Sequence, residues 1–444
     1  MDHSKQLATE KVSKLLIKFS IPAIVGMLVN ALYNIVDRIF IGNGVGALAI
    51  SGLSITFPIV IIIMAFGMLV GIGSAASISI KLGENKKDEA EKILGNAFIL
   101  SIVVSIIVTI LGFIFMDDVL KSFGASDKTI YYVKEYLSII LIGAVLQNIG
   151  FGLNNIIRAE GNPKVAMKTM LIGAITNTIL DPIFIFIFKL GIKGAALATI
   201  ISQGINAIWV LNYFVKGNST LKLKTENFKL NKKIIITIFS IGMSPFAMQI
   251  AASFVNVILN KNLVRYGGDF AIGAMGIINS ISMLILMPIF GINQGSQPII
   301  GYNYGAKQNE RVKKTLKAAI FAATTIATFG FILVETIPDV LIKIFSSDSE
   351  QLIDIGTKGI RVFLFMLPII GFQIVCSNYF QAIGKAKISI LLSLSRQVIV
   401  LIPLLLILPK YLGLKGVWLS APISDITASL LTAVFIFKEM KDLK

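Results

Sequence analysis

Twelve apolar segments, each more than 20 residues long, dominate the sequence and limit the folds open to it. A helix that crosses the hydrocarbon core of a bilayer needs about 20 apolar residues. The chain is 55% hydrophobic and only 15% charged, which excludes an ordinary soluble domain of 444 residues. We therefore expect an all-α polytopic membrane protein with transmembrane helices near 15–36, 48–78, 93–115, 130–156, 165–187, 192–214, 236–260, 270–300, 316–336, 356–380, 388–408 and 414–437.

Lysine and arginine gather in alternate connecting segments. With the N-terminus inside, the inward-facing stretches hold 27 of these residues and the outward-facing stretches hold 10. Cytoplasmic loops carry such an excess, so we expect a multi-pass protein of a bacterial inner (plasma) membrane with both termini in the cytoplasm. The same asymmetry accounts for the net charge of +17 without a nucleic-acid partner.

The two halves of the chain repeat one another at an offset of 222 residues. This offset pairs Asn34 with Asn256 and Gly83 with Gly305. Each half has six spans, an even number, so both halves enter the membrane in the same direction and the repeats are parallel, as in many secondary transporters. We expect an N-lobe with helices 1–6 (residues 1–214), a cytoplasmic linker (215–235) and a C-lobe with helices 7–12 (236–444).

Polar side chains interrupt three spans of the first half, and the two acids, an amide and a hydroxyl among them fall at a similar depth. The polar side chains are Asn30, Asn34 and Asp37 on span 1, Asn177 and Asp181 on span 5, and Thr199 on span 6. A charged residue costs roughly 2.5–3.5 kcal/mol at the bilayer centre on insertion scales, and such residues mark ion and proton pathways. Asp37, Asn177, Asp181 and Thr199 are therefore candidates for a cation-coupling site. The alternatives are an interfacial Asp37 beside Arg38 and a structurally paired Asp181.

The candidate cation site has no counterpart in the second half. The offset maps Asp37 to Leu259 and Asp181 to Pro403, neither of them an acid, so the candidate site belongs to the first half only.

The second half contains a charged pair that the first half lacks. Arg396 in span 11 and Asp425 in span 12 both lie near the expected bilayer midplane, and the offset maps them to the neutral Ala174 and Gln203. An arginine at that depth nearly always faces a partner or an aqueous cavity. We expect an ion pair between Arg396 and Asp425; the alternative is that Arg396 alone lines a central cleft and repels cations.

Two prolines fall inside spans that carry the polar residues. Pro22 in span 1 and Pro182 in span 5 each remove one helix hydrogen bond and can kink the helix. We expect both to act as bending points.

Four short stretches resemble the multidrug and toxic-compound extrusion (MATE) transporters. They are RAEGNPK (158–164), NTILDP (177–182), QPIIGYNYGAK (297–307) and SRQVIVLIPLLLILP (395–409), and the resemblance covers essentially the whole chain. It is strongest to the MepA-like and DinF-type bacterial multidrug exporters. The resemblance implies two six-helix lobes around a V-shaped cleft, and exchange of H⁺ or Na⁺ for cationic amphipathic drugs.

The same resemblance implies roles for individual residues. Asp37, Asn177, Asp181 and Thr199 match the family's cation site, while Asn30, Asn154 and Met170 match positions that line the N-lobe cavity. On this resemblance, the buried acids can be protonated, neutralised by Na⁺ or paired with a cationic drug, and these states exclude one another, as an exchanger requires. Asp37 and Asp181 would hold the Na⁺ if sodium is the coupling ion. Asn34 shares the helical face of Asn30 and joins the expected substrate-binding set. Some relatives place ion-binding acids on spans 7 and 10, but this sequence has none there.

Other functions are less consistent with the sequence. A flippase for lipid-linked saccharides is the main alternative, but such proteins tend to have a cationic cleft, whereas the candidate site here is acidic. We expect no enzyme, because GxSxG, HExxH and P-loop patterns are absent. We also expect no cofactor beyond the coupling ion, and a monomer whose partners are drugs and membrane lipids.

Overall fold

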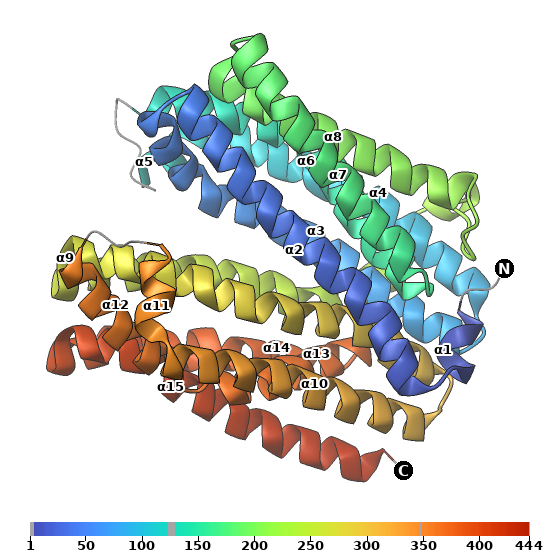
Figure 1. Ribbon diagram of the computed structural model, residues 1–444. Coiled ribbons are helices and arrows are strands. Elements are labelled where there is room, and N and C mark those ends of the chain that lie inside the picture. Colours follow the sequence, from blue (N-terminus) through green and yellow to red (C-terminus); the bar gives the residue numbers. More distant parts are fainter. Residues whose placement is uncertain (1–3, 123–128, 346–348, 444) are drawn as a thin grey trace. The chain divides into compact units, whose positions relative to one another are not determined.

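The computed structural model describes residues 4–122, 129–345 and 349–443, and these residues form helices and turns without a β-strand (Figure 1). Contacts divide the chain into two compact units. Unit 1 comprises Met1–Glu10 and Val25–Phe246, and unit 2 comprises Lys11–Ile24 and Ala247–Lys444. Each unit is a bundle of long helices.

The first part of the chain forms eight α-helices, a π-helix (η1) and a short 3₁₀ helix (η2). They are α1 (Lys5–Thr9), α2 (Val12–Gly44), α3 (Ala47–Gly83), α4 (Lys87–Ile114), α5 (Met116–Ser122), α6 (Ile130–Ala159), α7 (Pro163–Pro182), η1 (Ile183–Ile187), α8 (Gly191–Val215) and η2 (Thr225–Phe228). The start of α7 illustrates the local signals. Asn162 accepts a hydrogen bond from Val165 N at 3.4 Å, and Pro163 occupies the first turn, where its missing N–H is not needed.

The second part forms seven α-helices and a second π-helix. They are α9 (Lys232–Gly305), α10 (Asn309–Thr336), α11 (Pro338–Lys343), α12 (Glu350–Phe363), α13 (Leu367–Ala382), α14 (Ala386–Leu394), η3 (Ser395–Leu401) and α15 (Ile402–Asp442).

The division by contacts falls inside α2 and α9 and so differs from the predicted lobe boundaries at two places. Lys11–Ile24 packs with unit 2, and residues 232–246 pack with unit 1. Glycines explain why residues 232–246 pack with unit 1, because they let the start of α9 approach α3 closely. A Cβ atom on Gly242 would lie 1.8 Å from the carbonyl oxygen of Leu69.

Within the described residues, nine helices are long and apolar enough to cross a membrane, or ten if α12 and α13, bent by 50°, form one span. Two of these segments are too long for one crossing. α9 has 74 residues and Ala386–Asp442 has 57, whereas a span needs about 20. Each contains one glycine with non-helical backbone angles, Gly268 and Gly413. Dividing both segments there is consistent with the twelve predicted spans.

Backbone conformation repeats at the sequence offset. Eight of the nine described residues with positive φ occur in matching pairs: Gly46 with Gly268, Asn85 with Lys307, Gly191 with Gly413, and, at an offset of 223, Gly161 with Gly384. The ninth, Lys189, has no such counterpart. The breaks inside α9 and α15 are therefore the counterparts of the breaks before α3 and before α8. Two halves that turn at the same places have the same fold, in agreement with the predicted six-helix repeats.

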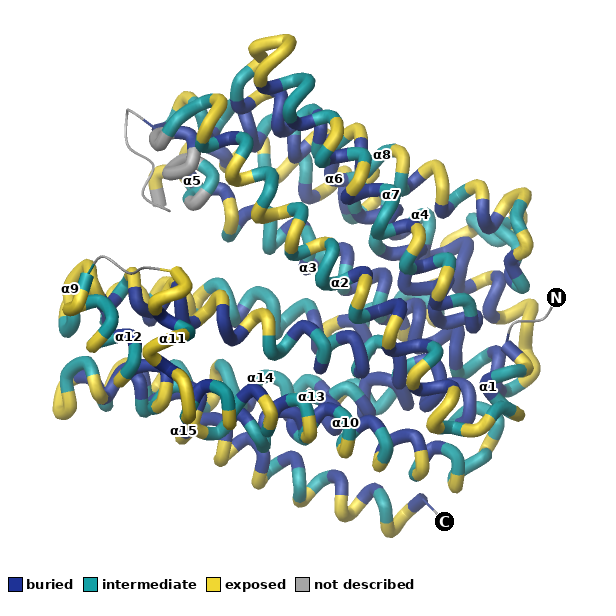
Figure 2. The backbone as a smooth tube through the Cα atoms, in the orientation of Figure 1, coloured by how far each residue is buried: buried dark blue, intermediate teal, exposed yellow. Residues whose placement is uncertain are grey.

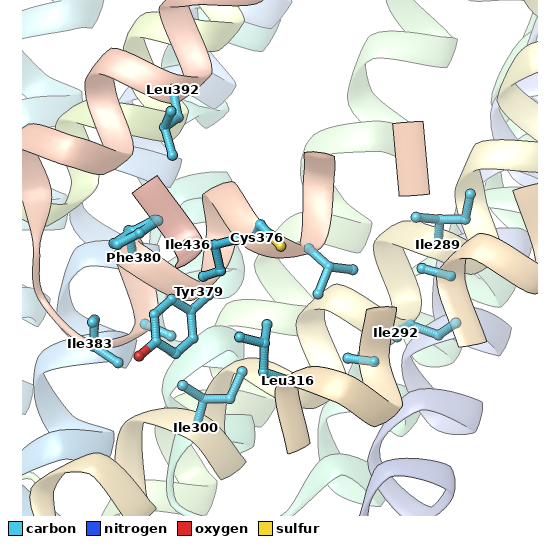
Figure 3. Close-up of a cluster of buried hydrophobic side chains, with 14 of the residues drawn as sticks. Ile289, Ile292, Ile300, Leu316, Cys376, Tyr379, Phe380, Ile383, Leu392 and Ile436 are labelled. Atoms are coloured by element: carbon cyan, nitrogen blue, oxygen red, sulfur yellow. The ribbon is translucent and has the colours of Figure 1, made fainter. Parts of the chain in front are cut away.

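The helices have apolar surfaces on both sides. Inward-facing residues build clusters such as the one in unit 2 that contains Leu316, Cys376, Tyr379 and Phe380 (Figure 3). Exposed residues recur along the long helices (Figure 2). Many of them carry large hydrophobic side chains, for example Phe321, which is 75% exposed. Exposed apolar surface on nearly every long helix fits a lipid solvent, in which the backbone must be satisfied within each helix.

Candidate functional site

The two predicted acids meet in unit 1. Asp37 comes from α2 and Asp181 from α7, and their carboxyl groups lie close enough to interact directly. Asp181 has no exposed surface. Two neighbouring negative charges in a buried place repel each other, so such a pair favours a bound proton or cation. The two acids therefore form one carboxyl pair.

Asn177 connects this pair to a third helix. It lies one turn before Asp181 on α7, and its Nδ2 atom is 3.3 Å from Asp181 Oδ1 and 3.5 Å from Thr199 Oγ1 on α8. Asn177 is almost fully buried. The four residues predicted to couple cations thus gather at one place from α2, α7 and α8.

Two tyrosines at this place were missed by the sequence reasoning. Tyr33 is one turn before Asp37 on α2, and Tyr136 comes from α6. Both interact electrostatically with Asp37 and Asp181, and Tyr136 also hydrogen-bonds to Thr199. The i, i+4 spacing from Asp37 could have identified Tyr33. Tyr136 had no such signal, because an isolated tyrosine in an apolar helix is usually a core residue.

Three oxygen atoms of the site are buried and find no hydrogen-bond partner within the described part of the chain. They are Asp37 Oδ1, Asp181 Oδ2 and Asn177 Oδ1. Buried acceptors without partners are rare in native structures and call for an explanation. Two carboxylates and an amide oxygen suit a proton or a hard cation, which prefers oxygen ligands. Among the described residues, no group of three His, Cys, Asp or Glu side chains is placed to hold a metal ion.

The residues predicted to bind substrate do not all join the acids. Asn30 and Asn34 are exposed on α2, where Asn34 Nδ2 donates to Asn30 O at 2.7 Å. Asn34 also hydrogen-bonds to Tyr33, which links it to the acidic pair. Met170 on α7 packs against Gly26 of α2, where a Cβ atom would lie 2.6 Å from its sulfur. Asn154 is buried in α6, and its Oδ1 atom has no partner among the residues that the structure describes.

Both prolines predicted to be bending points lie where a helix passes from one unit to the other or becomes irregular. Pro22 is inside α2, two residues before the point where contacts pass from unit 2 to unit 1. Pro182 is the last residue of α7, and the π-helix η1 follows it directly.

Arg396 and Asp425 form an ion pair inside unit 2. Arg396 Nε lies 2.6 Å from Asp425 Oδ1, with side-chain exposures of 28% and 3%. The hydroxyl of Ser424 donates to the Arg396 carbonyl oxygen at 2.5 Å. Arg396 lies in the π-helix η3, and such wide turns often occur at functional positions. The geometry is that of the predicted pair, not of a lone arginine.

Comparison with known proteins agrees with this architecture. The MatE family matches residues 22–183 and again residues 245–407, once in each half. The multidrug export protein MepA of Staphylococcus aureus (strain MRSA252) is 30% identical over 426 residues, which are 96% of this chain and 94% of MepA. The alignment therefore covers nearly the full length of both proteins.

Two solved structures extend the comparison. The MATE multidrug transporter DinF-BH, solved in complex with a ligand, is 40% identical with a TM-score of 0.90, covering 96% of this chain and 95% of that one. A MOP superfamily transporter from Pyrococcus furiosus is 26% identical with a TM-score of 0.93, covering 99% and 98%. That transporter is described as having a binding pocket of reverse polarity that suggests a different function. The polarity of the binding site therefore bears on function as well as the fold does.

Proposed function

Because this chain belongs to the MatE family, we propose that it is a secondary transporter that exports cationic amphipathic drugs in exchange for H⁺ or Na⁺. The observation that carries the proposal is the buried carboxyl pair of Asp37 and Asp181. The acidic character of this pair supports a cationic cargo.

The exchange follows from competition for one pair of acids. A proton on the pair, a Na⁺ ion held by Asp37 and Asp181, or a cationic drug nearby each neutralises the same charge. Binding of the ion therefore weakens binding of the drug, and by linkage the drug weakens binding of the ion to the same degree. One charge moving through 100 mV supplies about 2.3 kcal/mol, before any concentration gradient is counted.

We assign the drug to the surroundings of this pair in unit 1. Asn30 and Asn34 present amide groups on the exposed face of α2, and Asn34 reaches the acids through Tyr33. Met170 offers a flexible apolar contact of the kind that suits varied ligands. The relative DinF-BH is a multidrug transporter that was solved with a ligand bound, which supports a drug as cargo.

The setting of the proposed transporter follows from its sequence. The lysine and arginine distribution supports a bacterial inner (plasma) membrane protein with both termini in the cytoplasm. We propose that it acts as a monomer surrounded by lipid, without a nucleic-acid partner, an enzymatic activity or a cofactor other than the coupling ion.

Transport by the purified protein in vesicles tests this function. With a pH gradient or a Na⁺ gradient imposed separately, a fluorescent cationic drug should move uphill under one gradient and stop when that gradient is collapsed. Absence of uphill movement under either gradient would contradict the proposal. Movement of a lipid-linked saccharide in the same vesicles, without drug movement, would favour the flippase alternative.

A further inference from the structure

The linker between the halves lies against unit 1 along most of its length. Its later part is held by Asn96 of α4, whose Nδ2 lies 3.3 Å from the carbonyl oxygens of Asn227 and Lys229 and whose Oδ1 accepts from Asn231 N at 2.8 Å. η2 therefore packs on α4. Every group in these contacts is uncharged, so they do not depend on pH.

Two glutamates hold the earlier part, and their surroundings differ. Glu91 of α4 accepts from Lys222 N at 3.2 Å and pairs with Lys224 Nζ at 2.7 Å. Glu160, just after α6, has no exposed surface. Its carboxyl group accepts hydrogen bonds from the Tyr213 hydroxyl, from Ser219 Oγ at 2.6 Å and from Leu221 N at 3.2 Å.

Glu160 has no cationic partner among the residues that the structure describes. The charged groups on its surrounding elements are either bonded elsewhere or exposed. Arg158 donates to Asn155 and Lys222 Nζ to Gly217 O, while Lys224 and Lys87 face Glu91. Lys5 on α1, Lys164 on α7 and Lys216 after α8 are exposed, and Glu10 after α1 is half-buried. An ionised Glu160 would therefore be a buried charge stabilised by hydrogen bonds alone.

A protonated Glu160 keeps every contact of the docked linker. Hydroxyl groups both donate and accept, so the acid proton can be donated to the Tyr213 oxygen while Oε2 still accepts from Ser219 and Leu221. Burial without a counter-charge raises the pKa of Glu160 to about 7, despite the hydrogen bonds that lower it. The docked linker thus favours the protonated form.

We propose that Glu160 is a proton-binding site that controls the first part of the linker, near residues 216–221. This part is docked on unit 1 when Glu160 holds a proton, and it is released when the proton leaves to water. The direction follows from linkage: if docking strengthens proton binding, the proton strengthens docking equally. Each pKa unit is a tenfold effect, so deprotonation weakens docking on the order of a hundredfold. The site is on the side that the charge distribution assigns to the cytoplasm.

A nitroxide label on the linker tests this proposal without any drug or ion gradient. Asn218 is exposed beside the Glu160 contacts, so Asn218→Cys in a Cys376→Ala background receives the label. Its spectrum should change from immobile to mobile as the pH rises between about 4.5 and about 7, with no further change above about 7. Glu160→Gln, which mimics the protonated acid, should keep the label immobile throughout.

Controls make the outcome decisive. A label at Thr225→Cys, in the part held by Asn96, should not respond to pH. Ser219→Ala removes one contact of the docked linker, so the label at position 218 should become mobile at lower pH than in the otherwise wild-type chain. The proposal is overturned by a pH-independent label at position 218 in the otherwise wild-type chain or by an equal transition in Glu160→Gln. Should Glu160→Gln fail to fold, an unchanged or higher midpoint in Ser219→Ala overturns it. Because nothing is transported, failure here leaves the proposed function untouched.

Discussion

A carboxyl group held without exposed surface in an apolar bundle weakens the fold, so its presence points to a function. Asp181 is therefore the most direct test of coupling. Asp181→Asn keeps the shape of the side chain but removes the charge that a proton or Na⁺ neutralises. Uphill export should fall to the level of passive leak, while the amount of folded protein in the membrane stays the same. The measurement is drug accumulation in vesicles under the gradient that drives the wild type.

Two further variants show whether the loss is specific. Asp37→Asn should lose coupling as Asp181→Asn does, because the two carboxyl groups lie together in one pair. Asp354→Asn, at an exposed acid in unit 2, should transport normally. Wild-type export by Asp181→Asn would rule out exchange at this pair, and normal coupling in Asp37→Asn alone would limit the site to Asp181.

Glu160 makes a second prediction, for stability against pH. Burial raises its pKa from 4.5 to about 7, so the native state binds the proton more tightly than the unfolded state does. The free energy of unfolding therefore falls as the pH rises from about 4.5 to about 7 and is constant above that. Glu160→Gln removes this dependence. Thermal melts should show the variant gaining roughly 3 kcal/mol relative to wild type across the window, whereas parallel curves would contradict the assignment.

Sequence reasoning worked best where residue type and spacing restrict the choice. An acid inside an apolar run is costly, so Asp37 and Asp181 could be selected, and helical spacing added Asn177. Tyr33 and Tyr136 were missed because their roles depend on which helices become neighbours. Glu160 was missed for a different reason: it belongs to a polar loop, and only the structure places Tyr213, Ser219 and Leu221 around it.

The proline inside α2 gives a prediction for a whole helix. Pro22→Ala restores a backbone hydrogen bond and removes a helix-breaking residue, a change of about 3 kcal/mol in favour of a straight helix. Transport should slow more than drug binding weakens. Rates in vesicles and binding by fluorescence would measure the two effects, with Pro58→Ala in α3 as the control. Equal losses of rate and affinity would mean that Pro22 only shapes the site statically.

The ion pair that joins η3 to α15 gives another prediction. Breaking a buried pair on one side typically costs 3–5 kcal/mol, while neutralising both sides costs much less. Arg396→Gln and Asp425→Asn should each lower the melting temperature, and the double variant should recover part of the loss. The exposed pair Lys358–Asp354, at 2.7 Å, is the control and should show little coupling. Strictly additive losses in the Arg396–Asp425 cycle would show that the contact does not stabilise unit 2.

Hydropathy located the spans but not their irregularities. It cannot detect the extra residue of a π-turn, so η1 and η3 were not expected, although Pro182 lies directly before η1. The pattern of apolar residues also did not indicate the 50° bend between α12 and α13. The exchange of Lys11–Ile24 and residues 232–246 between units depends on tertiary packing, which a hydropathy pattern does not contain.

The internal repeat was the strongest sequence signal for the whole molecule. An offset found between residue types reappears in the backbone, where Gly46 and Gly268 have positive φ, as do Gly191 and Gly413. Such agreement arises because a turn constrains both the residue and its conformation. The parallel orientation of the two repeats in the membrane is a further prediction, because it depends on an even number of spans in each half.

Six spans in each half place equivalent residues on the same side of the membrane. Phe188 and Lys410 are one such pair, expected outside, and Lys87 and Asn309 are another, expected inside. In a Cys376→Ala background, a membrane-impermeant maleimide should label cysteines at positions 188 and 410 in spheroplasts. It should reach positions 87 and 309 only after permeabilisation. If the two members of either pair were labelled from opposite sides, a half would contain an odd number of spans and the repeats would be inverted. If both pairs were labelled from the sides opposite to those expected, the repeats would be parallel but the termini would lie outside, against the distribution of lysine and arginine.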